Sequence, residues 1–222
     1  MKPGQPTRIP QPDQRWTVTI PKDKFDEIKG DPEFCALVTL GRAVNALHFV
    51  HTPLLSAEND DGPRAMRDRY NSLLFTCALF AEVMPLVEGM QRYFKGHPAF
   101  QRMADVTNGK EAHELQAELY RLRKTLVFHF DPAEVQQQMK TLELENPIFV
   151  TALGTQKVNT YLELSDLAAL RTFFGPDFPK DVAKMRPVLQ SISKLAVSFL
   201  EAAEDFMVAL MMERGWADMQ FL

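Results

Sequence analysis

The strongest constraint on the fold is a long apolar pattern near the C-terminus. From about Asp181 to Arg214, apolar residues recur at intervals of three and four, and Gly215 follows the pattern. At about 1.5 Å per residue, such a helix spans roughly 45 to 50 Å, the length of a whole domain. One face of this helix is apolar from end to end, so other elements have to cover it. The apolar positions are Met185, Val188, Leu189, Ile192, Leu195, Ala196, Phe199, Phe206, Met207, Leu210 and Met211.

Two helices are predicted in the first half of the chain. The first begins at residues 31–33, where an acid precedes a proline at the first helical position, and should end near His51, before the next proline. The second begins after the loop at residues 59–63 and becomes apolar on nearly all sides from Leu73 to Val87. Pro85 should kink it. A helix without a polar face is buried in the middle of a domain or in an interface.

A third long helix is predicted from about residue 110 to 130. Its leucines form a stripe at spacings of four, three and four, and Asp131-Pro132 ends it. A shorter helix should follow from Pro132 to Leu142. The stripe consists of Leu115, Leu119, Leu122 and Leu126.

Three segments predict structure other than helix. Residues 1–14 contain four prolines and should form a disordered tail. Residues 16–20 alternate apolar and polar side chains, which is typical of a short strand. Residues 148–153 and 157–164 flank a glycine-containing turn and predict a β-hairpin near 147–164. We therefore expect a mainly α fold, a helical bundle with a small β-hairpin, in a single domain over residues 15–222.

Composition limits the classes of function. The chain has 222 residues, of which 45% are hydrophobic and 24% charged, with a formal net charge of -4. Such a chain is not broadly attracted to nucleic acid or to anionic membranes, so RNA binding would need a local basic patch. The longest apolar run, residues 72–87, contains Glu82 and Pro85 and is too short to span a bilayer. We expect no contact with a membrane.

The two cysteines bear on the cellular compartment. Cys35 and Cys77 both lie in apolar helical patterns, which predicts small buried side chains and not a disulfide framework or a metal set. Reduced thiols favour a cytoplasmic location. The N-terminus also lacks the apolar core of a signal peptide.

The segment from Arg121 to Pro132 contains the strongest candidate for chemistry. Arg123 offers a permanently charged planar fork that matches a phosphate. His129 has a side chain whose unperturbed pKa permits acid and base catalysis near neutrality. At about 100° per residue, His129 lies about 40° to one side of the leucine stripe and Arg123 about 80° to the other. Within one helix, Arg123 and His129 therefore cannot form a hydrogen bond with each other. A phosphate between two copies of the helix would contact both residues.

This segment resembles the R-x(4-6)-H signature of the HEPN superfamily, the higher eukaryote and prokaryote nucleotide-binding domains. Five residues separate Arg123 from His129. The resemblance implies an all-α bundle that dimerises, faces its Arg and His across the dimer, and cleaves RNA without a metal. It further implies a toxin or phage-defence role with an antitoxin-like partner. The family usually has Asn, Asp or His directly after the arginine, whereas this chain has Lys124.

Two further groups of residues are candidates for substrate binding. Tyr120, Arg121 and Lys124 flank the motif and would supply stacking and local positive charge. A second group lies on the first two predicted helices and would line a pocket beside the motif. Alternatively, its members form hydrogen bonds between helices. The group consists of Arg42, Asn45, Asp68 and Asn71. His48 and His51 lie three residues apart but lack a nearby glutamate at metal-binding spacing. We expect no metal and no cofactor.

The same residues permit a structural interpretation. A histidine near the C-terminus of a helix is favoured by the helix dipole, and an arginine beside an apolar stripe covers apolar surface with its methylenes. In that case the chain is a non-catalytic interaction protein. It would use the apolar helix 72–87 or the long C-terminal helix to bind itself or a partner.

Overall fold

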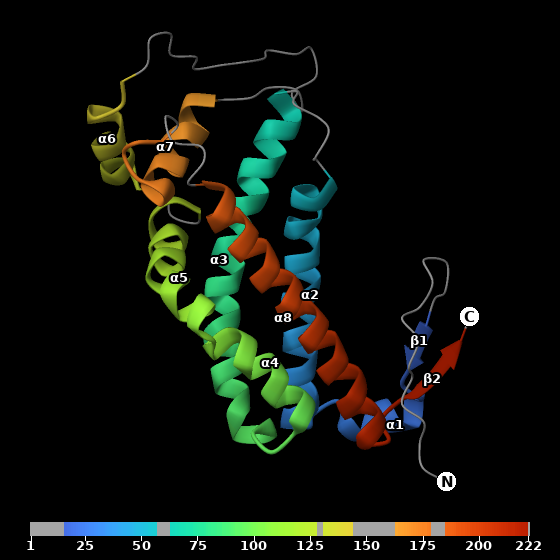
Figure 1. The fold of residues 1–222 in the computed structure, drawn as a ribbon. Coiled ribbons are helices and arrows are strands. Elements are labelled where there is room, and N and C mark those ends of the chain that lie inside the picture. The colour runs from blue at the N-terminus through green and yellow to red at the C-terminus, as the bar shows by residue number, and fades with distance from the viewer. Residues whose placement is uncertain (1–15, 57–62, 128–130, 144–162, 179–184, 222) are drawn as a thin grey trace.

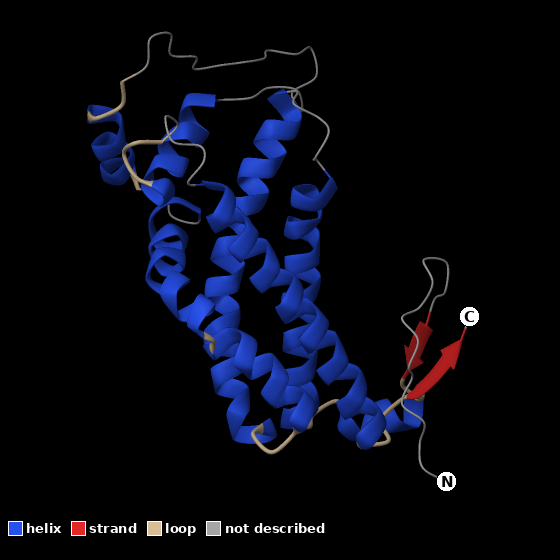
Figure 2. Ribbon diagram, in the orientation of Figure 1, coloured by secondary structure: helices blue, strands red, loops and turns tan. Residues whose placement is uncertain are grey.

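The computed structural model describes residues 16–56, 63–127, 131–143, 163–178 and 185–221, and in these ranges the fold is mainly helical. The helices form an elongated bundle with a two-stranded sheet at one end (Figures 1 and 2). In chain order the elements are β1 (Trp16–Thr19), α1 (Lys22–Ile28), α2 (Pro32–Ser56), α3 (Pro63–Phe94), α4 (Pro98–Asn108), α5 (Lys110–Leu122), the π-helix η1 (Arg123–Val127), α6 (Pro132–Lys140), α7 (Glu163–Phe174), α8 (Met185–Glu213) and β2 (Asp218–Phe221).

The long C-terminal helix α8 runs across the bundle, as its apolar pattern predicts (Figure 1). It contacts α2, α3, α4 and α5. Near its C-terminal end, the ring of Phe206 lies 5.2 Å from Phe94 and 5.3 Å from Phe100, measured between centroids. Gly215 has a φ of 61°, a left-handed conformation that suits glycine and ends the helix. The buried apolar residues of α8 are Ile192, Leu195, Ala196, Phe199, Leu200, Ala203, Phe206 and Leu210.

The central helix α3 is less enclosed than its sequence predicts. It contacts α2, α4, α5, η1, α7 and α8, yet Phe75, Glu82 and Pro85 remain exposed. Within one chain the neighbouring elements do not close around the whole circumference of α3, so the expected burial in the middle of the domain is incomplete, and burial of the remaining face in an interface stays a prediction. By length and composition, the stretches Pro32–Leu54 and Arg67–Phe94 are apolar enough to cross a membrane, and 33% and 61% of their apolar windows are buried in the fold. Core helices of soluble proteins pass the same test.

Helix α2 continues through Pro53 to Ser56, past the end predicted near His51. A proline inside a helix removes the hydrogen bond to the carbonyl four residues earlier. Here that carbonyl belongs to Phe49, whose side chain is 81% exposed, so this side of the helix is open to water. Water can satisfy the carbonyl, and the helix does not have to stop.

The strand predicted at residues 16–20 is confirmed as β1, but its partner lies at the other end of the chain. β1 pairs with β2 in antiparallel register, with Trp16 opposite Phe221 and Thr19 opposite Asp218. The predicted tail and most of the predicted hairpin lie outside the described residues. The last two hairpin positions, Glu163 and Leu164, begin helix α7 instead of ending a strand.

The two cysteines differ in their surroundings. Cys77 is buried as predicted, whereas Cys35 is exposed, so its predicted burial is wrong. On α2 the buried face passes through Phe34 and Leu37, and the neighbouring Cys35 points away from it. Both thiols are free. Burial raises the pKa of the Cys77 thiol to about 12.

We expect the native protein to expose one fast-reacting thiol and one protected thiol. A thiol reagent should label Cys35 rapidly and Cys77 only after unfolding. Burial keeps the reagent away from the Cys77 sulfur and disfavours its reactive thiolate form. Labelling rates with Cys35→Ser and Cys77→Ala separate the two. Equal rates in the native state would contradict the burial of Cys77.

The aromatic cluster around Phe206 should dominate the stability of the bundle. Phe206→Ala removes a fully buried ring, and such truncations lower the free energy of unfolding by about 3 to 5 kcal/mol. Phe49→Ala is the matched control, because this phenylalanine is 81% exposed and should change the free energy by about 0.5 kcal/mol or less. Urea unfolding followed by circular dichroism measures both. Similar losses in the two variants would show that Phe206 does not organise the core.

Candidate functional site

The motif segment departs from a regular α-helix at its arginine. The helix predicted to run from 110 to 130 is α5 only as far as Leu122, and residues Arg123–Val127 form the π-helix η1. A π-turn contains more residues than an α-turn and shifts the direction of every side chain that follows it. Here it places Val127 in the core, where it is 5% exposed. Such turns are frequent at functional sites.

Arg123 is oriented by a carboxylate of the central helix. Its guanidinium Nε pairs with the carboxylate of Glu82 on α3. The Arg123 side chain is 39% exposed and that of Glu82 is 45% exposed, so the pair lies at the surface. Exposed ion pairs contribute about 0 to 1 kcal/mol, so a phosphate can displace the carboxylate at low cost. His129 lies outside the described residues.

The residues beside Arg123 have different surroundings. Arg121 donates a hydrogen bond to the backbone carbonyl of Thr172 on α7, and its guanidinium lies 3.8 Å from the carboxylate of Glu134 on α6. Arg121 therefore links α5 to two neighbouring helices. Lys124 is exposed, and Tyr120 is half-buried. Arg121 and Lys124 are thus both exposed, and Arg121 is held by the contacts with α6 and α7.

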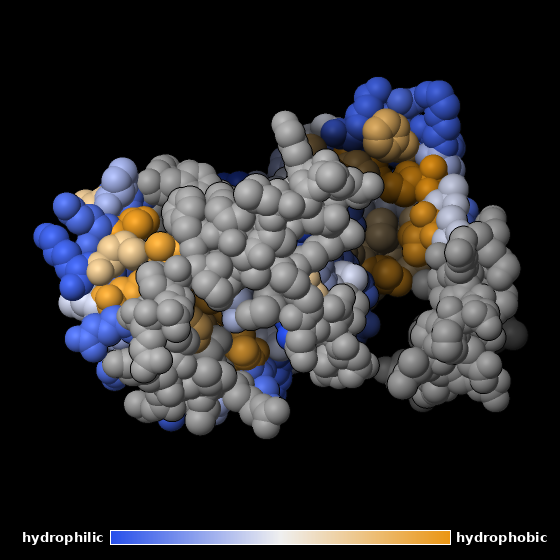
Figure 3. Space-filling model, turned by 90° about the horizontal axis from the view of Figure 1, so that it is seen from above, coloured by the Kyte–Doolittle hydropathy of each residue, from blue (hydrophilic) through white to orange (hydrophobic). Residues whose placement is uncertain are grey.

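A pocket of about 240 Å³ lies beside the motif, between α3, η1, α6 and α7. Asn71 on α3 donates a hydrogen bond to the carbonyl of Arg67 (2.9 Å) and a longer one to the carboxylate of Asp166 on α7 (3.4 Å). The bundle end that holds α6 and α7 shows apolar residues among hydrophilic ones (Figure 3). The lining residues are Asn71, Leu74, Phe75, Val127, Val135, Ser165, Asp166 and Ala169.

Helix α7 is held in place by a buried arginine. Arg171 is 3% exposed and donates hydrogen bonds to the carbonyl of Phe178 (2.8 Å) and to the hydroxyl and carbonyl of Thr141 (3.0 and 3.2 Å). Because buried polar groups are costly to leave unpaired, these bonds fix α7 against the chain that follows α6. The position of Asp166 at the start of α7 follows from this contact.

The carboxyl group of Asp166 is poised to titrate near neutrality. Burial raises its pKa to about 6, against the opposing effects of the Arg67 charge and the Asn71 hydrogen bond. Arg67 also pairs with the adjacent Asp68: its Nη2 and Nε atoms lie 2.8 and 3.0 Å from the Oδ1 atom of that carboxylate. Sequence reasoning missed Asp166 because no element was predicted between the hairpin, which was expected to end at residue 164, and the long C-terminal helix. An acidic residue in the first turn of a helix is a typical start signal, and Asp166 itself, three residues after Glu163, was that signal for α7.

The second predicted group of residues does not come together around this pocket. Asn71 lines it, whereas Asp68 forms the ion pair with Arg67. Arg42 and Asn45 are exposed on α2, and no described residue of α2 lines the pocket. The prediction that Arg42 and Asn45 line a pocket beside the motif is therefore wrong among the described residues. Helix α2 contacts α3 and α8 instead.

The histidine pair lies in a separate cavity of about 240 Å³ between α2 and α8. His48 contacts Glu204 at 2.5 Å between Nε2 and Oε1. His51 is 2% exposed, its Nε2 lies 3.3 Å from the hydroxyl of Ser193, and burial lowers its pKa. Among the described residues, no cluster of three or more His, Cys, Asp or Glu side chains has metal-binding geometry.

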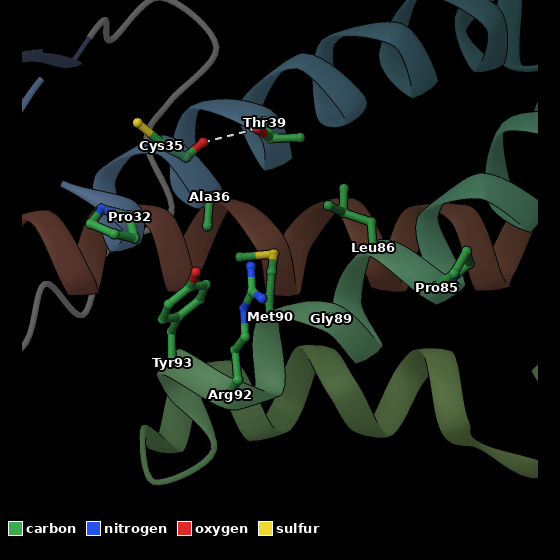
Figure 4. Close-up of a pocket in the computed structure, with 10 residues that line it drawn as sticks. All are labelled: Pro32, Cys35, Ala36, Thr39, Pro85, Leu86, Gly89, Met90, Arg92 and Tyr93. Carbon is green, nitrogen blue, oxygen red and sulfur yellow. Dashed lines mark hydrogen bonds between the residues drawn. The ribbon is translucent and has the colours of Figure 1, made fainter. Parts of the chain in front are cut away.

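Another cavity, of about 530 Å³, is an open groove between α2 and α3 (Figure 4). Ala36 on α2 and Gly89 on α3 line opposite sides of the groove, and Cys35 lies near one end of it, close to Pro32. The Arg92 guanidinium stacks over the ring of Tyr93 at 4.5 Å from its centroid. The described residues that line this groove include no carboxylate or histidine, so they offer no carboxylate–histidine pair for acid–base chemistry.

Comparison with protein-family models, with curated proteins and with solved structures finds no match for this chain. Inferences about function therefore rest on the geometry of the chain itself.

The raised pKa of Asp166 should make stability depend on pH. Because the folded state binds this proton more tightly than the unfolded chain does, the free energy of unfolding should fall as pH rises from about 4 to about 6, and then level off. Two pKa units correspond to at most about 3 kcal/mol. Asp166→Asn should remove this part of the slope, measured by urea unfolding at several pH values. Identical slopes in Asp166→Asn and in the wild type would rule out a raised pKa.

Proposed function

We propose that the protein is a metal-independent endoribonuclease of HEPN type that acts as a homodimer. The observation that supports this most is the placement of Arg123. Its guanidinium is half-exposed on a π-turn, is oriented by Glu82, and lies on the segment that leads to His129. An oriented and accessible guanidinium suits a phosphate contact, because its planar fork can donate two parallel hydrogen bonds to the phosphate oxygens.

The proposed reaction uses the RNA's own 2′-hydroxyl as nucleophile. His129 accepts the proton of this hydroxyl as general base, and the 2′-oxygen forms a bond to phosphorus. The bond from phosphorus to the 5′-oxygen breaks, and that oxygen takes a proton from an imidazolium, which a second copy of the chain would supply. Arg123 stabilises the charge that develops on the phosphate oxygens. The products are a 2′,3′-cyclic phosphate and a 5′-hydroxyl.

The basic side chains near the motif are compatible with RNA binding, although the chain as a whole is acidic. The whole chain has a formal charge of -4, so attraction to RNA has to come from the motif region. Lys124 is exposed there beside Arg123, and a dimer would bring two such segments together. A cytoplasmic toxin-like enzyme with an antitoxin-like partner would fit the free thiols and the proposed activity.

One observation favours the alternative, a non-catalytic helical interaction protein. Helix α2 exposes large apolar side chains, with Val38 at 57% and Phe49 at 81% exposure. Exposed apolar residues of this size can mark an interface. In this alternative, Arg123 keeps Glu82 as its permanent partner and never contacts RNA.

Purified protein should cleave single-stranded RNA in excess EDTA and leave 2′,3′-cyclic phosphate ends. His129→Ala should reduce the rate by a hundredfold or more, roughly the contribution of acid–base catalysis. Arg123→Lys should also lose activity, because lysine keeps the charge and lacks the planar fork. Gel analysis of end-labelled RNA and of the terminal phosphates measures these effects.

Matched controls test whether the losses are specific. His113→Ala and Arg102→Lys change the same residue types at exposed positions on α5 and α4, and should keep full activity. Light scattering should show that all four variants remain dimers. Full activity in His129→Ala would assign the cleavage to a contaminant or another site. A folded wild-type dimer that leaves RNA intact would overturn the proposal in favour of the interaction protein.

A further inference from the structure

We infer that the pocket between α3 and α7 binds a guanine base of the RNA, at a fixed offset from the phosphate held by Arg123. This inference rests on the proposed function and names the substrate that the same site prefers. It follows from three features of the pocket: its polar groups, its walls and its position beside the motif.

The polar groups of the pocket present hydrogen-bond acceptors. The Asn71 amide nitrogen already donates to the carbonyl of Arg67 and to Asp166, which leaves the Asn71 amide oxygen to accept. The Asp166 carboxylate accepts on both oxygens when it is ionised. A pKa of about 6 leaves most of this group ionised at pH 7 to 8. A ligand that pairs with both Asn71 and Asp166 therefore has to offer N–H donors, whereas the Ser165 hydroxyl, which also lines the pocket, can donate or accept.

Among the four RNA bases, guanine fits this arrangement best. Its N1–H and its 2-amino group are neighbouring donors on one edge, which matches a carboxylate and an amide oxygen. Adenine and cytosine place an acceptor nitrogen next to their amino group, and uracil flanks its single N–H with two carbonyls. These acceptors would face the oxygens of the half-buried Asn71 and Asp166, and this apposition of acceptors without a donor between them is unfavourable.

The walls of the pocket suit a flat ring. Leu74, Val127 and Ala169 supply apolar contacts, and Phe75, which is 36% exposed, lines the pocket with an aromatic ring. Single-stranded RNA is commonly bound by splayed bases that stack on aromatic side chains while polar groups contact their edges. The pocket has a volume of about 240 Å³, and its lining includes the exposed residues Phe75 and Ser165.

The position of the pocket ties the base to the site of cleavage. Val127 lines the pocket and lies four residues after Arg123 on the same π-turn. Along α3, Phe75 and Glu82 are separated by seven residues, which corresponds to roughly 10 Å. A base in the pocket is thus held near, but not directly at, the phosphate bound by Arg123. Cleavage should therefore occur at a constant distance in sequence from a guanine.

Two measurements test this inference separately from the proposed function. The first maps cleavage sites in a pool of random single-stranded RNA in EDTA, where guanine should be enriched about tenfold or more at one position. The second measures binding of guanosine, inosine and adenosine 3′-monophosphates by calorimetry. Inosine is the matched ligand because it lacks only the 2-amino group. Guanosine should bind about tenfold or more tightly than the other two.

Variants assign the preference to this pocket. Asp166→Asn replaces one acceptor by a donor and should abolish the guanine preference in both measurements. Ser165→Leu places a larger side chain at an exposed lining position and should weaken binding of all three nucleotides. Asp205→Asn, an exposed carboxylate on α8, is the control and should behave as the wild type.

The outcomes distinguish the two ideas. RNA cleavage without base preference, together with equal binding of the three nucleotides, overturns the guanine pocket and leaves the ribonuclease proposal standing. Guanosine-selective binding that Asp166→Asn abolishes, in a protein that does not cleave RNA, supports the pocket and overturns the ribonuclease proposal. A guanine preference that persists in both Asp166→Asn and Ser165→Leu places guanine recognition elsewhere and overturns the inference.

Discussion

Burial of the apolar face of α8 is the interaction on which the rest of the fold depends. Phe199 packs edge-on against Phe80 of α3, and Phe206 contacts rings from α3 and α4. These contacts fix α3 along much of its length. Because α3 also provides Asn71 and Glu82, the core indirectly sets the distance between the pocket and the partner of Arg123. Helix α3 is thus both the centre of the core and the support of the candidate site.

The opposite side of that site is assembled by polar contacts. Arg121 joins α5 to α6 and α7, and Arg171 joins α7 to the segment after α6. Helix α6 has no fully buried residue, so apolar packing alone does not hold this end of the bundle. Guanidinium groups with several donors can bridge elements that share little apolar surface. The site therefore lies where a rigid core meets a periphery held by hydrogen bonds.

Sequence reasoning recovered the long helices and β1, made no prediction for the short helices α1 and α4, and missed the features set by distant contacts. The apolar period of α8 and the alternation of β1 each lie within one segment, so both were predicted. The partner strand β2 was missed because pairing across the whole chain leaves little local signal. The π-turn was missed because an angle of 100° per residue presupposes a regular α-helix. Asp166 was missed with α7, and its raised pKa depends on burial that no spacing reveals.

The Arg123–Glu82 pair separates the two proposed functions in energetic terms. In an interaction protein the pair is a surface ion pair, which contributes at most about 1 kcal/mol to stability. In the proposed ribonuclease, the carboxylate keeps the guanidinium extended and yields to an RNA phosphate, which also forms two parallel hydrogen bonds with the fork. The carboxylate then lowers the affinity for RNA while it limits the number of conformations that Arg123 has to lose on binding. A pocket that adds contacts to one base would offset that loss of affinity. This is a physical reason for Asn71 of the pocket and Glu82, the partner of Arg123, to lie on the same helix, α3.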